Sequence, residues 1–213
     1  MKIKSLFLPL LVALALFSCD KNTSIPSNVH TVKVNPFSEL RFKSKDTPGL
    51  TIYPNQRPLE IGYSFSVSLN GAINEIGLCL PGKGHTYTTT LRNGTAKEVL
   101  PPKNITQYSG GFSFTNIDLV LTKETVSIQP DHTNMISVNQ VPVGSANPGL
   151  AGSFYVASRT DLHPIFPLKK DVVTYDQQCN YPASTPTYPT NEIQSTNLIG
   201  GIFDVMFTYT STK

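Results

Sequence analysis

Apolar and small polar residues alternate over residues 61 to 69. The apolar positions are Ile61, Tyr63, Phe65, Val67 and Leu69, with glycine or serine between them. A period of two predicts a β-strand with one face in a core and the other in water. The pair Asn70-Gly71 follows directly and predicts a type I′ turn, because both residues tolerate a positive φ. We therefore expect a hairpin whose returning strand buries Ile76, Leu78 and Leu80.

Similar short runs recur through the rest of the chain. They cover residues 85–91, 96–100, 111–114, 117–121, 125–128, 135–138 and 152–157. Asn93-Gly94 predicts a second hairpin between the first two of these runs, and Pro101-Pro102 is expected to end its second strand. Helical periodicity is nowhere sustained without an intervening glycine or proline. Many short strands between turn signals predict an all-β sandwich or barrel.

The chain closes with a regular alternation over residues 202 to 210. Its apolar face carries Phe203, Val205, Phe207 and Tyr209. We expect this terminal strand to pair inside a sheet and to fix the C-terminus. Asp204 falls on the opposite, polar face, where a salt bridge or a hydrogen bond to a loop is expected rather than a catalytic role.

The N-terminal 18 residues have the features of a bacterial lipoprotein signal peptide. Lys2 and Lys4 precede an apolar stretch over residues 6–17, which is shorter than the roughly 20 residues of a membrane span. Leu16-Phe17-Ser18-Cys19 resembles a lipobox, in which the cysteine is acylated and becomes the first residue of the mature protein. Several acyl chains on one residue would anchor the protein stably. The alternative is an ordinary secretory signal with an incidental cysteine.

These features predict three parts of the chain and one location. Residues 1–18 are expected to be the signal peptide, 19–30 the lipidated Cys19 with a flexible tether, and 31–213 the β-sandwich. The expected partner at Cys19 is membrane lipid, and the expected location is the bacterial cell envelope, at the outer membrane. A single acidic residue, Asp20, follows the cysteine, so the sequence leaves open which side of that membrane the domain faces.

The charge balance argues against a nucleic-acid partner. The chain has 17 Lys and Arg against 14 Asp and Glu, and without Lys2 and Lys4 the balance is 15 against 14. An electrostatic nucleic-acid binder would carry a basic stripe, which this sequence lacks. Only 15% of the residues are charged, as is common in secreted β proteins.

Several motifs together resemble one known family. Gly62-Tyr-Ser-Phe65 is followed by Gly71-Ala-Ile73-Asn-Glu-Ile76, His85-Thr86 precedes Leu91, and the closing strand reads Ile202-Phe203-Asp204-Val205-Met206-Phe207. Over residues 59–208 these motifs resemble the secreted bacterial family called domain of unknown function 4082, although Arg92 stands where the family has tryptophan. The resemblance implies a single antiparallel, jelly-roll-like β-sandwich, often found beside glycan-related modules. It implies no known activity and no catalytic residues.

The remaining motifs predict no metal, no cofactor and no catalytic machinery. The stretch Gly77 to Gly84 nearly matches a phosphate-binding loop, but it lacks the magnesium-binding residue and the following helix. The histidines have no zinc-type spacing, and neither a calcium loop nor a serine nucleophile elbow is present.

Two cysteines and three tyrosines are the other candidate site residues. An exported protein permits a disulfide between Cys79 and Cys179, although Cys79 is equally compatible with a buried strand position. Residues 175–191 are rich in proline and are predicted to form a long irregular loop. Its tyrosines, Tyr175, Tyr181 and Tyr188, could stack on sugar rings or pin the loop to the sandwich.

Three functions are compatible with these patterns. The first is a non-catalytic envelope lipoprotein whose sandwich binds a glycan or a protein partner. The second is a structural or assembly lipoprotein of an outer-membrane complex. The third is a glycan hydrolase, which would need two carboxyl groups about 5 to 9.5 Å apart in a cleft.

Overall fold

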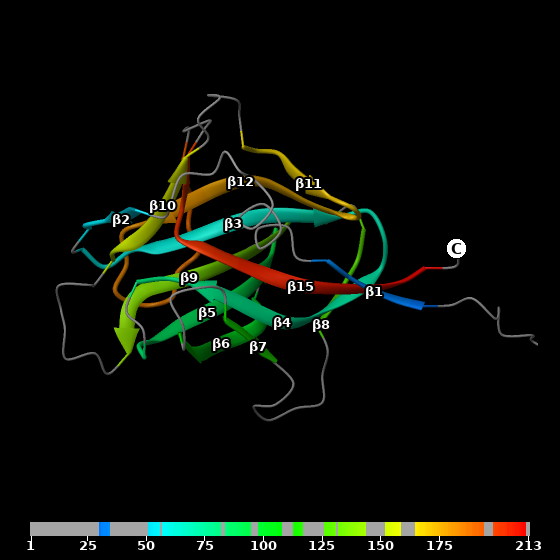
Figure 1. Cartoon of the computed structure of the whole chain (residues 1–213), viewed down its shortest axis with the longest axis horizontal. Coiled ribbons are helices and arrows are strands. Elements are labelled where there is room, and N and C mark those ends of the chain that lie inside the picture. The colour runs from blue at the N-terminus through cyan, green and yellow to red at the C-terminus, as the bar shows by residue number, and fades with distance from the viewer. Residues whose placement is uncertain are drawn as a thin grey trace, which may run out of the picture. The chain divides into compact units, whose positions relative to one another are not determined.

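The computed structural model describes a chain built from strands (Figure 1). The described residues are 30–34, 51–55, 57–81, 84–94, 98–107, 113–116, 126–130, 132–143, 152–158, 165–193 and 198–211. The strands are β1 (His30–Val34), β2 (Thr51–Tyr53), β3 (Glu60–Val67), β4 (Gly71–Cys79), β5 (Thr86–Asn93), β6 (Glu98–Thr106), β7 (Ser113–Asn116), β8 (Val126–Ile128), β9 (Asn134–Val143), β10 (Phe154–Ser158), β11 (Leu168–Lys170), β12 (Val173–Tyr181), β13 (Asn191–Glu192), β14 (Leu198–Gly200) and β15 (Ile202–Ser211).

Two compact units divide the chain. One is Thr31–Thr210, and the other comprises Met1–His30 with Ser211–Lys213. Of the second unit only His30 and Ser211 are among the described residues, so the predicted signal peptide, Cys19 and the tether lie outside them. Within the described ranges, the structure contains no helix that is long and apolar enough to cross a membrane.

The unit Thr31–Thr210 is an antiparallel β-sandwich. One sheet has the order β1-β15-β4-β7, with β8 also beside β4, and a second has the order β11-β12-β3-β9-β5-β6, with β13 beside β12. A small sheet, β14-β10-β2, completes the described strands. The two large sheets bury one apolar core, in which Tyr63 of β3 meets Phe203 of β15 with ring centroids 4.8 Å apart.

The order of the strands is that of a jelly roll. Leaving out the small sheet, β8 and the β11 to β13 addition, eight strands remain, and they pair first with last, second with seventh, third with sixth, and fourth with fifth. The pairs are β1 with β15, β3 with β9, β4 with β7, and β5 with β6. Such nested pairing is a long hairpin rolled into two sheets. The prediction of an all-β, jelly-roll-like sandwich is therefore confirmed, with β12 added beside β3.

The hairpin predicted at Asn70-Gly71 is wrong. Strands β3 and β4 lie in different sheets, and β3 pairs with β9 and β12 instead. Residues 68–70 cross from one sheet to the other with a bend at residues 68 and 69, and packed sheets lie about 10 Å apart. Leu69 belongs to this crossing and not to the buried face of β3, and 44% of its surface is exposed.

The hairpin predicted at Asn93-Gly94 is confirmed, but its second strand is longer than expected. Strand β6 pairs with β5 and runs through Pro101-Pro102 to Thr106. The strand order places β6 at the edge of its sheet, where missing N–H groups are tolerated. The ladder is also irregular there, since Thr89 pairs with Lys103 but Leu91 pairs with Leu100.

Four of the other predicted strands overlap strands of the structure. Strands β8, β9 and β10 overlap the runs at 125–128, 135–138 and 152–157, and β7 overlaps the run at 111–114. The run at 117–121 lies outside the described residues. Residues 175–181 belong to β12, so the predicted irregular loop begins only at Pro182.

The C-terminal strand is placed as predicted, except for Asp204. Strand β15 lies between β1 and β4, which fixes the C-terminal part of the chain inside a sheet. Asp204 is fully buried rather than on a water-facing side. Its Oδ1 accepts hydrogen bonds from the Tyr175 hydroxyl at 2.8 Å and from the Val205 N–H at 2.8 Å. The expected hydrogen bond exists, but its partner is a core tyrosine of the opposite sheet and not a loop.

Candidate functional site: a polar groove on the outer face of the seven-stranded sheet

The outer face of the seven-stranded sheet is polar because its strands alternate. The core side of β3 carries Ile61, Tyr63 and Phe65, so Ser64 and Ser66 point away from the core. Strand β9 alternates in the same way, with Ile136 and Val138 in the core and Met135 on the outer face.

A bulge in β12 supplies two further polar groups to this face. Tyr175 pairs with Phe65, but Gln177 pairs with Ser64, so Asp176 is an extra residue in the ladder. A bulge changes the direction of the side chains that follow it. Gln178 consequently points inward and bonds to the backbone of Gly200, while Asp176 and Gln177 both line the outer groove.

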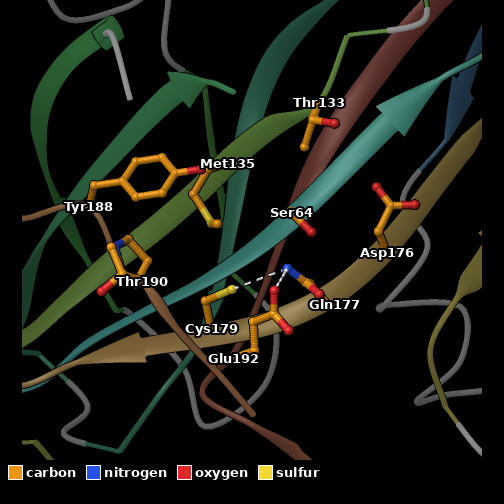
Figure 2. Close-up of a pocket in the computed structure, with 10 residues that line it drawn as sticks. Ser64, Thr133, Met135, Asp176, Gln177, Cys179, Tyr188, Thr190 and Glu192 are labelled. Carbon is orange, nitrogen blue, oxygen red and sulfur yellow. Dashed lines mark hydrogen bonds between the residues drawn. The ribbon is translucent and has the colours of Figure 1, made fainter. Parts of the chain in front are cut away.

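Two adjoining hollows form this groove. The first has a volume of about 420 Å³, and its walls are drawn in Figure 2: Ser64, Thr133, Met135, Asp176, Gln177, Cys179, Tyr188, Pro189, Thr190 and Glu192. The second has a volume of about 390 Å³ and adds Ser66, Ser68, His132, Lys169 and Thr174. Thr133 and Asp176 line both hollows, so together they form one groove along the strands.

The side-chain amide of Gln177 forms hydrogen bonds with two other residues that line the first hollow. Gln177 Nε2 lies 3.2 Å from Glu192 Oε1 and 3.8 Å from Cys179 Sγ, and it donates to both (Figure 2). Burial, and next the nearby Glu192 carboxylate, raise the pKa of the Cys179 thiol. A thiol with a raised pKa stays protonated at neutral pH and is a poor nucleophile. Burial also raises the pKa of Asp176.

Residues 182–190, which we call the strap, cover the part of the same face next to the groove. Asn139 Nδ2 of β9 donates to the carbonyl oxygen of Ala183 at 3.2 Å. Pro189 packs so closely over Gly62 of β3 that a Cβ atom there would lie 2.6 Å from Pro189 Cγ. The strap continues into Tyr188, Pro189 and Thr190, which form one wall of the groove.

Beneath the strap lies a buried charged pair. Glu60 of β3 and Arg92 of β5 are 0% and 3% exposed, and Arg92 Nη1 lies 3.8 Å from Glu60 Oε1. Arg92 Nη1 donates to Ser137 Oγ at 2.7 Å, and Asn139 Nδ2 donates to Glu60 Oε2 at 3.1 Å. Burial raises the pKa of Glu60, and the hydrogen bonds from Ser137 and Asn139 and the Arg92 charge oppose that shift.

The raised pKa of Glu60 predicts a pH-dependent stability. The folded protein holds the Glu60 proton at pH values where the unfolded chain releases it, so this contribution is present below the ordinary pKa of 4.5 and is lost as the pH rises through the folded value. Relative to Glu60→Gln, the wild type is expected to gain unfolding free energy as the pH falls from 7 towards 4.5. Urea unfolding of both proteins across this range measures the difference. A pH-independent difference would contradict the prediction.

Of the three predicted tyrosines, only Tyr188 lines the groove. Tyr175 is fully buried in the core, where its ring lies 5.8 Å from that of Phe65, so of the two roles that the sequence left open it has the packing role and not stacking on sugars. Tyr181 ends β12 and is 40% exposed, outside the groove walls. The three rings therefore do not form one platform, because strand alternation and the bulge turn them in different directions.

The predicted disulfide is absent. Cys79 and Cys179 are both buried thiols. Cys79 ends β4 and pairs with Ile202 in one sheet, whereas Cys179 pairs with Gly62 in the other. Cys79 is thus the buried strand residue that the sequence allowed, and Cys179 belongs to the groove.

Most residues of the groove could not be predicted from the sequence. Asp176, Glu192 and Thr133 stand in no distinctive motif, and only the bulge and the pairing of β12 with β3 and β13 bring the first two together. The charged pair was not predictable either, since Glu60 and Arg92 adjoin apolar residues of predicted strands at positions that the alternation turns away from the core.

Comparisons of the chain with protein-family models, with curated proteins and with solved structures found no match. The family resemblance therefore remains a prediction from the motifs. Among the residues that the structure describes, no group of three or more His, Cys, Asp or Glu side chains could hold a metal ion.

Proposed function

We propose that this protein is a non-catalytic lipoprotein of the cell envelope whose jelly roll binds a glycan in the groove. The observation that carries the proposal is the groove itself. Its two hollows share Thr133 and Asp176 and run along the strands, which suits a chain of sugar units better than a single compact molecule.

The groove chemistry matches a ligand rich in hydroxyl groups. The carboxyl groups of Asp176 and Glu192 accept hydrogen bonds, the Gln177 amide can donate and accept, and the hydroxyls of Ser64 and Thr133 do both. Tyr188 and Met135 provide apolar surface for the C–H faces of a sugar ring. This mixture of polar groups and one aromatic wall supports a sugar ligand over a purely apolar one.

The predicted lipid anchor at Cys19 would locate this glycan binding at the outer membrane. An acylated Cys19 and the tether to residue 30 would hold the domain at the outer membrane, a prediction that the mass of the N-terminal peptide of the mature protein tests directly. Glycans of the envelope or of the surroundings would then be within reach.

A binding screen tests the proposal. The mature domain is applied to an array of bacterial, plant and host glycans, and hits are measured by calorimetry. We expect Tyr188→Ala to weaken binding by about tenfold or more, equivalent to about 1.4 kcal/mol, because it removes the aromatic wall. Tyr181→Ala is the matched control, since Tyr181 is an exposed tyrosine outside the groove, and it should bind as the wild type does. Absence of glycan binding, or equal losses in both variants, would contradict the proposal.

Glycan hydrolysis is a second candidate, supported by one observation. Asp176, whose pKa is raised, and Glu192 line the same hollow, and glycosidases use two carboxyl groups with separated pKa values. The same glycan hits distinguish the two functions. Under the binding proposal no reducing ends are released during prolonged incubation. Release that both Asp176→Asn and Glu192→Gln abolish would replace binding by hydrolysis.

A further inference from the structure

We propose that the buried pair of Glu60 and Arg92 is a latch that holds the strap on the sheet and so positions the Tyr188 wall of the groove. This inference deepens the proposed function and rests on it for its biological meaning, because the strap contributes Tyr188, Pro189 and Thr190 to the groove. The latch itself is a property of the fold that can be tested without a ligand.

The position of the pair is unusual for a β-sandwich. Glu60 and Arg92 lie on the face of the sheet that points away from the core, since their neighbours Ile61 and Leu91 are core residues. Such a face is commonly solvated in antiparallel sheets, and charged residues belong there. Here both side chains are almost completely buried, and Ser137 and Asn139 between them are buried as well.

The strap is bonded to this charged layer through Asn139. Asn139 Nδ2 connects Glu60 Oε2 at 3.1 Å with the carbonyl oxygen of Ala183 at 3.2 Å, near the start of the strap. The backbone of Thr187, next to Tyr188, lies close enough to the Glu60 carboxyl to lower its pKa. Glu60 is therefore linked to the strap through Asn139, and it also lies near Thr187 of the strap.

The energetics of buried charges make this layer suitable as a latch. A buried ion pair is tolerated only while both partners and their hydrogen bonds are in place, and removing one partner leaves the other charge without compensation. If Arg92 is removed, the buried Glu60 carboxylate loses its counter-charge and is stabilised by water instead, and water reaches it when the strap lifts. The closed strap and the complete pair therefore favour each other.

Two thiols report on the strap and on the core separately. Cys179 is 3% exposed and lines the groove together with Tyr188 and Pro189, so a lifted strap exposes it. Cys79 is fully buried on the other sheet, within the hydrophobic core. Reaction of Cys79 thus requires opening of the sandwich, whereas reaction of Cys179 requires only local opening.

The experiment is thiol alkylation of the mature, folded protein under native conditions, with Cys79 and Cys179 quantified as separate peptides by mass spectrometry. We expect Arg92→Met to raise the labelling rate of Cys179 about tenfold or more while Cys79 stays protected. Lys33→Met is the matched control, because it removes one charge of the exposed Lys33–Glu75 pair and should leave both rates unchanged.

The outcomes are decisive in each direction. A folded Arg92→Met protein with wild-type labelling of Cys179 overturns the latch. If both thiols react faster together in that variant, Asn139→Ala decides, since it keeps both charges and removes the bonds to Ala183 and Glu60. Selective labelling of Cys179 there supports the latch, and parallel labelling overturns it. A domain that binds no glycan but opens selectively at Cys179 would refute the proposed function and leave the latch intact.

Discussion

Replacing Phe203 with alanine is expected to lower the free energy of unfolding by about 3 to 5 kcal/mol. Phe203 is fully buried on β15, pairs with Leu78 in its own sheet, and packs on Tyr63 of the opposite sheet at 4.8 Å. Alanine would remove the ring at the centre of the contact between the two sheets and leave a cavity that the rigid strands cannot fill. Chemical denaturation measures the change, and a fall in Tm of about 6 to 20 °C is expected with it.

Leu69→Ala is the control for this prediction. Leu69 continues the same apolar alternation that places Val67 in the core, yet it is 44% exposed in the crossing between the sheets. Its replacement should change the free energy of unfolding by less than about 0.5 kcal/mol. A loss at Leu69 comparable to that at Phe203 would mean that β3 continues into a buried hairpin, and it would contradict the two-sheet arrangement described here.

Replacing Arg92 with methionine is expected to cost about 3 to 5 kcal/mol of stability. Methionine preserves much of the length of the side chain, so the change mainly removes the positive charge and its donors. The Glu60 carboxyl, which is 0% exposed, then loses the positive charge 3.8 Å from it. Equilibrium unfolding in urea at pH 7 measures the loss.

Two further variants separate the charge effect from packing. Glu60→Met combined with Arg92→Met should recover much of the loss, because an apolar pair carries no desolvation penalty. Lys33→Met removes one charge of the exposed Lys33–Glu75 pair, whose atoms lie 3.4 Å apart, and should cost less than about 1 kcal/mol. A double variant no more stable than Arg92→Met would show that hydrogen bonds to Ser137 and Asn139, and not the charges, hold this layer together.

The groove and the latch together explain why the strap covers a polar face of the sheet, which neither the strand pattern nor the composition suggests. A proline-rich segment lies over a polar face, and its end forms a wall of the groove. Because no irregular segment can satisfy its own backbone groups fully, the strap needs partners on the sheet. Asn139 is one such partner, and it also bonds to Glu60. Binding in the groove and the integrity of the charged layer are therefore expected to change together.

The sequence by itself determined the strands and, for most of them, the side that faces the core. Ile61, Tyr63, Phe65 and Val67 are buried as the alternation predicts, and β15 begins and pairs as expected. Alternation is a local property, because successive side chains of a strand point to opposite faces wherever that strand lies. The pairing of β5 with β6 was predictable too, because Asn93-Gly94 is a local turn signal between two consecutive strands.

Only the tertiary structure decided which strands are neighbours and what covers the outer face. Asn70-Gly71 has the same turn chemistry as Asn93-Gly94, but β3 pairs with β9 and β12 in one sheet and β4 pairs with β15 and β7 in the other, and this choice of partners is not local. Cys179 and Tyr175, four residues apart on one strand, end in the groove and in the core because a bulge intervenes. Glu60 and Arg92 look like solvent-facing residues in the sequence. Their burial depends on a segment about 90 to 130 residues away that folds over them, and no local pattern contains that information.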